Sequence, residues 1–302
     1  MFKLPVGVDI NNLIDNLRIF SWQAADYLIY YSKLLKEGNM DRNFYKTDNM
    51  DDPVTMADLK VNELIIQKIR ENYVGIDWNI MSEENAKVED GILNSQTDWL
   101  WILDPLDGTK DFIQGTGDYA MHLALNYKNR PYLGVVLIPE KDELWIAFGN
   151  NVWCEKRDGS KTKPKLANKK NLQEMVLVTS KNHNNEILRN LIKQINCGEV
   201  IEMGSIGCKI ASIIRGDSDI YISLSLPGKS SPKDWDLAAP EAILKGSGGL
   251  ITDINNRELL YGKTKFEQSG ILIASNNSED HYKICFEVKK IIKEYDLYPL
   301  GL

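Results

Sequence analysis

The segment WLWILDPLDGTKDF, residues 99–112, carries an apolar run directly into acidic residues. An apolar run that ends in a turn is typical of a buried strand. Pro105 fixes its own φ and Gly108 permits a tight bend, so this turn can aim the carboxylates of Asp104 and Asp107 at one point. Carboxylates about 4 Å apart repel each other by roughly 1 kcal/mol in water, and by more when desolvated. Unless these aspartates merely form a turn, they need a positive partner such as a metal ion.

The composition is that of an ordinary globular protein, with 43% apolar and 26% charged residues among 302. A net charge of −7 argues against a nucleic acid polymer or an anionic membrane as partner. A metal ion would still let an acidic protein bind a small anion. No segment approaches the roughly 18 apolar residues that span a membrane, and the N-terminus lacks the apolar core of a signal peptide.

Cysteine and histidine chemistry have little support in this sequence. The four cysteines are scattered and form no C-x-x-C pair, which indicates reduced thiols and a cytoplasmic protein. The three histidines, His122, His183 and His281, are isolated, and we interpret each as structural or surface-exposed. Zinc sites and Ser–His–Asp catalysis are therefore disfavoured.

The first half of the chain is predicted to contain two helices and a set of sequential strands. Apolar residues at helical spacing predict a helix over residues 10–35, and TMAD at 55–58 is a capping-box-like start for a second helix. Short turns join the strands, which predicts a largely antiparallel sheet. These strands are predicted at residues 98–104, 119–127, 131–139, 143–148 and 151–156.

Strands alternate with helices after the lysine-rich stretch 161–170, which predicts an α/β arrangement in the rest of the chain. We therefore expect two halves, residues 1–170 and residues 171–302, of which the second is smaller. Its strands are predicted at residues 175–180, 219–225, 249–253 and 270–275, and its helices at 185–195, 205–214, 236–246 and 279–293.

Four segments, in order, resemble the inositol-monophosphatase-like superfamily of Mg²⁺-dependent, lithium-sensitive phosphatases. They are DPVTMAD at 52–58, MSEEN at 81–85, WILDPLDGT at 101–109 and DWDLAAPEAILKGSGG at 234–249. The resemblance implies a mixed α/β fold of the sugar-phosphatase type, with αβαβα layers. It also implies a phosphomonoesterase with two or three Mg²⁺ ions, in which a metal-activated water attacks the phosphate and no phospho-enzyme forms.

The resemblance also implies roles for single residues. The metal ligands would be the side chains of Glu83, Asp104, Asp107 and Asp236 and the backbone carbonyl of Leu106. Asp236 and Asp107 would also contact the substrate, and Glu83 would also serve in catalysis.

Asp58 and Thr109 would form the pair that orients and deprotonates the attacking water, and Gly108 and Thr109 would present backbone amides to the phosphate. A purely structural role in the capping box is the alternative for Asp58, and Glu84 is the alternative to Glu83 as ligand.

The distal aspartate also has support from local structure. Because proline is tolerated only near the first turn of a helix, Pro240 predicts a helix that begins close to Asp236. A helix N-terminus favours anions, so this end suits both a carboxylate and a phosphate. Simple N-capping by Asp236 is compatible with ligation and remains open.

Within the superfamily, Lys110 and Asp111 resemble the 3′(2′),5′-bisphosphate nucleotidase branch, as do residues 202–241. This branch implies hydrolysis of adenosine 3′,5′-bisphosphate, and of its sulfated analogue, to AMP and phosphate in sulfur assimilation. Ser205 and Lys209 are spaced i and i+4 at a predicted helix start, so both can face a second phosphate. Lys233 is a weaker candidate for the same contact.

Two alternatives remain open for the function. An inositol monophosphatase or a fructose-1,6-bisphosphatase would share every metal ligand, and a catalytically silent protein could bind metal or nucleotide only. In each case we expect a small phosphate ester as the partner and a monomer or homodimer.

Overall fold

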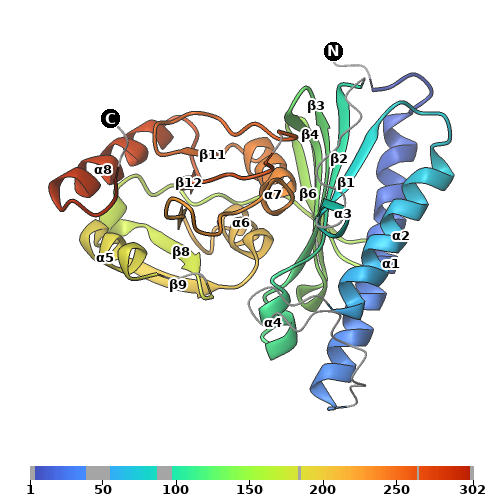
Figure 1. Cartoon of the computed structure of the whole chain (residues 1–302), viewed down its shortest axis with the longest axis horizontal. Coiled ribbons are helices and arrows are strands. Elements are labelled where there is room, and N and C mark those ends of the chain that lie inside the picture. Colours follow the sequence, from blue (N-terminus) through green and yellow to red (C-terminus); the bar gives the residue numbers. More distant parts are fainter. Residues whose placement is uncertain (1–3, 39–54, 87–96, 183–184, 264, 300–302) are drawn as a thin grey trace.

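The computed structural model describes residues 4–38, 55–86, 97–182, 185–263 and 265–299, so residues 52–54 of the first family-like segment and His183 lie outside the described residues (Figure 1). The helices in this part of the chain are α1 (Ile10–Lys36), α2 (Met56–Asn72), α3 (Glu83–Ala86), α4 (Thr109–Gln114), α5 (Glu186–Ile195), α6 (Ile206–Arg215), α7 (Asp234–Gly246) and α8 (His281–Glu294).

The strands form a seven-stranded and a five-stranded sheet. The first sheet contains β1 (Asn79–Ser82), β2 (Trp99–Asp107), β3 (Ala120–Tyr127), β4 (Arg130–Ile138), β5 (Glu143–Phe148), β6 (Asn151–Glu155) and β7 (Lys161–Thr162). The second contains β8 (Val176–Ser180), β9 (Glu199–Met203), β10 (Ile220–Leu224), β11 (Leu250–Asp253) and β12 (Ile271–Ser275).

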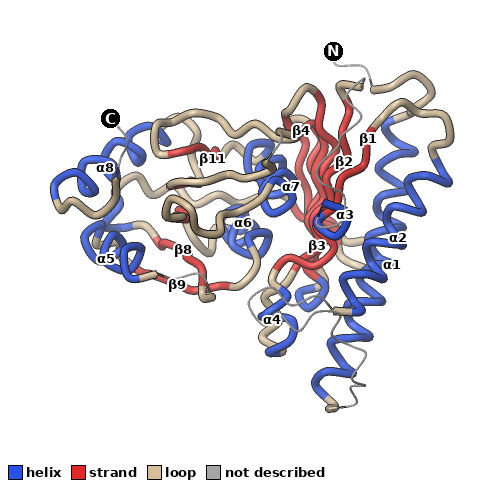
Figure 2. The backbone as a smooth tube through the Cα atoms, viewed as in Figure 1, coloured by secondary structure: helices blue, strands red, loops and turns tan. Residues whose placement is uncertain are grey.

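Helices and sheets alternate in five layers (Figures 1 and 2). Helices α1 and α2 cover the outer face of the first sheet, α6 and α7 fill the space between the two sheets, and α5 and α8 cover the far face of the second sheet. Three clusters of buried apolar side chains occupy the spaces between these layers. The expected mixed α/β fold with αβαβα layers is confirmed.

The first sheet runs in sequence order, and every pair from β2 to β7 is antiparallel. This confirms the antiparallel arrangement predicted for β2 to β6, whereas β7 lies in the lysine-rich stretch for which no strand was predicted. Strand β1, which the sequence analysis does not include, adds a parallel neighbour to β2. The second sheet has the order β11-β12-β10-β8-β9 and is mixed, because β8 is parallel to β9 and β10 whereas β12 is antiparallel to β10 and β11. Strand β9 was also not predicted.

The two outer helices begin and pack as their sequences predict. Thr55 and Asp58 form a capping box at the start of α2, where Thr55 Oγ1 accepts from the amide of Ala57 and Asp58 Oδ2 accepts from the amide of Thr55. Helix α1 buries the side that faces the sheet. Leu13, Leu17 and six further apolar residues or serines are buried there, and they recur every three to four residues.

Helix α7 begins two residues before the predicted start. It begins at Asp234, so Pro240 lies in the second helical turn and not near the first turn as predicted. The reason is a capping interaction: the carboxylate of Asp236 accepts a hydrogen bond from the amide of Lys233 at 2.6 Å, which places Asp236 at the third helical position. Proline has no N–H, so the carbonyl of Asp236 loses its usual partner within the helix.

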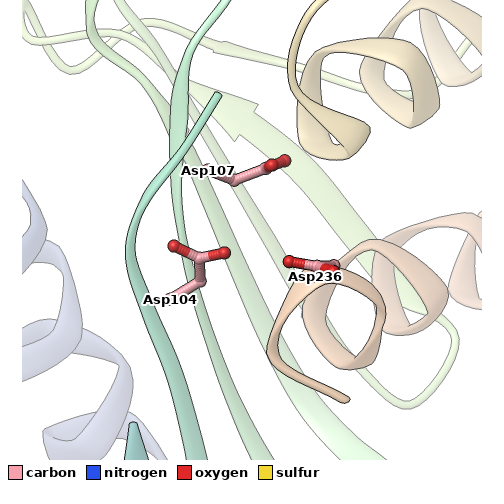
Figure 3. Close-up of side chains that lie close together, drawn as sticks. All are labelled: Asp104, Asp107 and Asp236. Atoms are coloured by element: carbon pink, nitrogen blue, oxygen red, sulfur yellow. The ribbon is translucent and has the colours of Figure 1, made fainter. Parts of the chain in front are cut away.

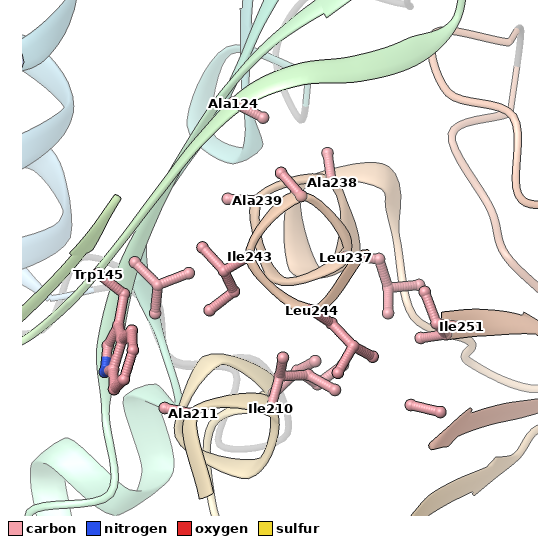
Figure 4. Packing of buried hydrophobic residues seen from close by; sticks show 14 of the residues in the cluster. Ala124, Trp145, Ile210, Ala211, Leu237, Ala238, Ala239, Ile243, Leu244 and Ile251 are labelled. Carbon is pink, nitrogen blue, oxygen red and sulfur yellow. The ribbon is translucent and has the colours of Figure 1, made fainter. Parts of the chain in front are cut away.

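Helix α7 joins the two sheets. Figure 4 shows Ala239 and Ile243 on the side of the helix that faces the first sheet, and Leu237 on the side of Ile251 in the second. The helix approaches β4 closely at Gly134, where an added Cβ would lie 2.5 Å from Cβ of Ala242. This packing determines where the N-terminal end of α7 lies relative to the first sheet.

We expect Gly134→Val to destabilise the protein by about 1–3 kcal/mol, because the new side chain would collide with α7 in a packed core. Urea unfolding measures this difference. Val74→Ala is the control, since Val74 is 82% exposed and its truncation should change stability by no more than about 0.5 kcal/mol. A Gly134→Val protein as stable as wild type would contradict the described contact between α7 and β4.

Candidate active site

A bulge in β2 brings the carboxylates of Asp104 and Asp107 to the same side of the sheet. Across β3, Asp104 pairs with His122 and Asp107 pairs with Ala120, so three steps along β2 oppose two steps along β3. Residues three apart in a regular strand point to opposite faces, and one extra residue restores a common face. The extra residue between the two aspartates therefore directs both carboxylates to one face of the sheet, in addition to forming a turn.

Asp236 comes to the same place from the other half of the chain. One carboxylate oxygen from each of Asp104, Asp107 and Asp236 lies within 4.8 Å of the others (Figure 3). Two of these side chains come from the end of β2 and the third from the first turn of α7. The cluster therefore depends on how the two sheets and the helix between them pack together.

The electrostatics of this cluster fit a bound cation. Burial raises the pKa values of Asp104 and Asp236 well above the usual range, and the neighbouring charges of Glu83 and Asp107 raise them further. Within the described ranges, no lysine or arginine forms an ion pair with Asp104 or Asp236. A set of carboxylate oxygens is the donor chemistry that hard divalent cations such as Mg²⁺ prefer.

Asp107 is held through one of its two oxygens. Oδ2 accepts hydrogen bonds from Ser205 Oγ at 2.6 Å and from the amide of Ile206 at 2.5 Å. Ser205 is fully buried and caps the N-terminus of α6, where its own Oγ accepts from the amide of Cys208. Ser205, predicted as a substrate contact, thus lies against a predicted metal ligand, and the second oxygen of Asp107 stays available.

The predicted catalytic carboxylates lie beside this cluster. Glu83 lines the same pocket as Asp104 and Asp236. Asp58 is buried, which raises its pKa to about 8; the charge of Glu83 adds to the increase, whereas the hydrogen bond from Thr55 opposes it. A carboxyl group with this pKa can hold or release a proton near neutral pH.

The hydroxyl group that bonds Asp58 belongs to Thr55. Its Oδ2 accepts from Thr55 Oγ1 at 2.5 Å, whereas Thr109 Oγ1 donates to the carbonyl of Leu106 at 3.1 Å. Within the described residues there is therefore no hydrogen bond between Asp58 and Thr109, and their pairing in catalysis stays a prediction. Gly108 has a φ of +88°, and an added Cβ would lie 2.8 Å from the carbonyl oxygen of Asp118, so glycine is required there.

The cluster opens into a pocket of about 670 Å³. Such a volume is typical of sites for small molecules and cofactors. Beyond the carboxylates, its lining comes from α4, α6 and β10, from residues at and before the start of α5, and from the segment that joins β10 to α7. The polar side chains in the lining include Thr109, Lys110, Asn182, Asn185, Ser223, Ser225, Lys229, Ser230 and Ser231.

The lysines considered for a second phosphate lie in different surroundings. Lys209 lines the pocket but is only 1% exposed; its Nζ donates to the carbonyl of Gly204 and lies 5.6 Å from the ring centroid of Tyr221. Burial lowers the pKa of Lys209, which the charge of Asp107 opposes. Lys233 forms an ion pair with Glu267 at 2.8 Å.

Asp111, which the sequence analysis compares with the nucleotidase branch, is fully buried. Its carboxylate accepts from Thr116 Oγ1 at 2.7 Å and from Asn182 Nδ2 at 2.5 Å. An added Cβ at Gly204 would collide with this carboxylate. Through the hydrogen bond to Asn182, Asp111 therefore joins helix α4 to the part of the pocket wall that Asn182 forms.

His122 is isolated in the sequence, but the structure places it beside the site. The ring is fully buried, and Nε2 lies 3.4 Å from Oδ2 of Asp107. Burial lowers its pKa, and the charge of Asp107 partly opposes this decrease. The antiparallel pairing of the two predicted strands was the signal that could have placed His122 opposite Asp104.

His281 has a structural place in the fold, and the cysteines are reduced, as predicted. His281 is buried between Ser275 Oγ and Thr252 Oγ1, each 2.8 Å from a ring nitrogen. The four cysteines are free thiols, and all four lie in described ranges.

The fold and this pocket define a class of phosphatase, and a family comparison agrees with it. Residues 23–293 match the model of the inositol monophosphatase family, so the chain belongs to that family. The 3′(2′),5′-bisphosphate nucleotidase CysQ of Buchnera aphidicola is 33% identical over 229 residues, which make up 75% of this chain and 81% of that protein.

The chain is also similar to members of the family whose names differ from that of the nucleotidase. The Nus factor SuhB of Pasteurella multocida is 29% identical over 235 residues, covering 74% of this chain and 78% of that protein. The solved structure of the Thermotoga maritima IMPase superimposes with a TM-score of 0.72 at 23% identity, over 94% of this chain and 99% of the other. The likeness to this structure supports the fold. None of the helices within the described ranges is long and apolar enough to cross a membrane.

In the presence of a chelator, we expect Asp236→Asn to be more stable than wild type, and the difference to be larger at pH 8 than at pH 5. The folded protein raises the pKa of Asp236, so the protonated form contributes stability below the unfolded pKa near 4, and this contribution is lost as the pH rises through the folded value. Asparagine removes the charge and can still cap the helix.

Thermal unfolding in excess EDTA measures this effect, which should raise the midpoint by roughly 2 °C or more. Asp98→Asn is the matched control, because Asp98 is an exposed aspartate whose side chain is 56% accessible. An Asp236→Asn protein that is less stable than wild type at pH 8 would show that the buried charges do not oppose one another.

Proposed function

We propose that this protein is a Mg²⁺-dependent phosphomonoesterase that hydrolyses adenosine 3′,5′-bisphosphate to AMP and phosphate. The observation that carries the proposal is the convergence of Asp104, Asp107 and Asp236, from both halves of the chain, at one end of a pocket that can hold a nucleotide. The family match and the nucleotidase relative support the same reaction class.

The three clustered carboxylates would hold Mg²⁺ together with Glu83 and the backbone carbonyl of Leu106. Two or three bound ions would neutralise the phosphate, lower the pKa of a bound water and stabilise the leaving oxygen. The protein itself would fix the orientation of these oxygens through backbone amides.

The remaining roles belong to groups of the chain itself. The buried carboxyl group of Asp58, with a pKa of about 8, would accept a proton from the attacking water, and the hydroxyl of Thr109 would orient that water. The backbone amides of Gly108 and Thr109 would donate hydrogen bonds to the reacting phosphate.

The substrate assignment rests on the nucleotidase relatives and on the extent of the pocket. A bisphosphate carries a second anionic group away from the reacting one. We propose that Lys209 contacts it, whereas the buried hydroxyl of Ser205 holds the adjoining carboxylate of Asp107. Lys110 and Lys229 are further cations in the pocket lining. A cytoplasmic location and a role in sulfur assimilation accompany this proposal. The relative named SuhB and the IMPase fold support inositol 1-phosphate as the alternative substrate.

Phosphate release from a panel of substrates tests the proposal. The panel contains adenosine 3′,5′-bisphosphate, its sulfated analogue, inositol 1-phosphate and fructose 1,6-bisphosphate. We expect the highest kcat/KM for the adenosine bisphosphate, complete loss of activity in excess chelator, recovery with Mg²⁺ and inhibition by Li⁺. A preference for inositol 1-phosphate would refute the nucleotidase assignment, and full activity in chelator would refute the metal mechanism.

The second-phosphate contact has its own test. Lys209→Met keeps the length of the buried side chain but removes its charge, so kcat/KM for adenosine 3′,5′-bisphosphate should fall by about 10- to 150-fold, the loss of a charge-assisted contact of roughly 1.5–3 kcal/mol. Inositol 1-phosphate has no second phosphate, so its hydrolysis should be nearly unchanged.

Lys229→Ala is the matched control at the pocket surface. A selective loss in Lys229→Ala and not in Lys209→Met would assign the second phosphate to the segment between β10 and α7. Equal losses on both substrates in Lys209→Met would show that Lys209 supports the fold or the reacting phosphate.

A further inference from the structure

We infer that His122 is a positioning residue that holds the carboxylate of Asp107. The inference rests on the proposed cation site. His122 extends from β3 into the layer between the sheets, and its ring is completely buried. Nε2 faces Oδ2 of Asp107 at 3.4 Å, and Nδ1 faces the carbonyl oxygen of Trp235 at 3.4 Å.

The two ring nitrogens face both elements of the metal cluster. Asp107 ends strand β2, and Trp235 immediately precedes Asp236 in the first turn of α7. The ring therefore lies between the two parts of the chain whose relative position determines the spacing of the carboxylates. Groups that orient metal ligands from behind typically change metal affinity by 10- to 100-fold when they are removed.

Hydrogen bonding favours Asp107 as the functional partner of this ring. Nε2 is buried and has no hydrogen-bond partner within the described residues, and the facing acceptor is the carboxylate of Asp107. Buried polar groups are rarely left unpaired, and a charged acceptor binds a donor more strongly than a carbonyl does. We therefore assign the ring proton to Nε2, so that Nε2–H is directed at Oδ2.

Gly207 provides the space that this arrangement requires. An added Cβ at Gly207 would collide with Nε2 of His122 and would lie 2.9 Å from Cγ1 of Val136. The ring is thus confined between α6 and α7 and cannot turn away from Asp107 toward α6. Ser205 Oγ and His122 then hold the same oxygen of Asp107, which leaves Oδ1 for the cation.

The test compares three substitutions of His122. Glutamine places an amide N–H where Nε2 lies, asparagine places one where Nδ1 lies, and leucine provides neither. The dissociation constant of Mn²⁺, measured by electron paramagnetic resonance on the purified protein, should rise by about 10-fold or more in His122→Leu and His122→Asn. His122→Gln should remain within about 3-fold of wild type, and thermal unfolding in EDTA checks that each variant is folded.

Gly207→Ala supplies an independent variant, since it displaces the ring without altering it. We expect Gly207→Ala to weaken Mn²⁺ binding by about 10-fold in the wild-type background. In the His122→Asn background the same change should weaken binding little further, because the shorter side chain leaves room for the methyl group. If the loss of Mn²⁺ affinity in the double variant equalled the product of the losses in the two single variants, the inference would be contradicted.

The remaining outcomes separate this inference from the proposed function. Wild-type affinity in His122→Leu, or equal losses in His122→Leu and His122→Gln, would overturn the positioning role while leaving the cation site intact. Absence of Mn²⁺ binding in the wild-type protein would instead overturn the proposed function itself.

Discussion

Three carboxylates buried at one point repel one another, and hydrogen bonds from the surrounding backbone partly offset this repulsion. Each accepts backbone N–H groups: Asp104 from Leu106 at 3.0 Å, Asp107 from Ile206 at 2.5 Å and from Gly207 at 3.3 Å, and Asp236 from Lys233 at 2.6 Å. These bonds favour the charged form, whereas burial and mutual repulsion oppose it. The balance raises the pKa values of Asp104 and Asp236, so the cluster is stable as a fully charged group only with a cation.

The cluster also depends on the packing of helix α7 against the first sheet. The bulge in β2 turns two aspartates to the face that α7 covers, and the capping bond at Lys233 directs the third aspartate back toward β2. Close approach at Gly134 brings α7 against the first sheet. A site divided in this way between the first sheet and helix α7 forms only when the core between them is assembled, which couples the chemistry of the site to the stability of the fold.

Much of the fold could be predicted from the sequence because its elements carry strong local signals. The periodicity of α1 and the capping box at Thr55 are examples, and the acidic motif indicated a metal site through its residue types alone. The short strand β9 and the interior position of Pro240 depend on neighbouring elements, and local patterns do not report them. His122 was missed for the same reason: its role depends on strand pairing and on the missing side chain of Gly207.

The central claim is that Asp104, Asp107 and Asp236 together form a cation site. Anomalous diffraction from crystals soaked with Mn²⁺ tests it most directly, because the scattering locates the ion without reference to activity. The account predicts a strong peak within coordination distance, roughly 2.2 Å, of an oxygen from each of the three carboxylates. Fully occupied Mn²⁺ elsewhere in the molecule, with no peak between these side chains, would contradict it.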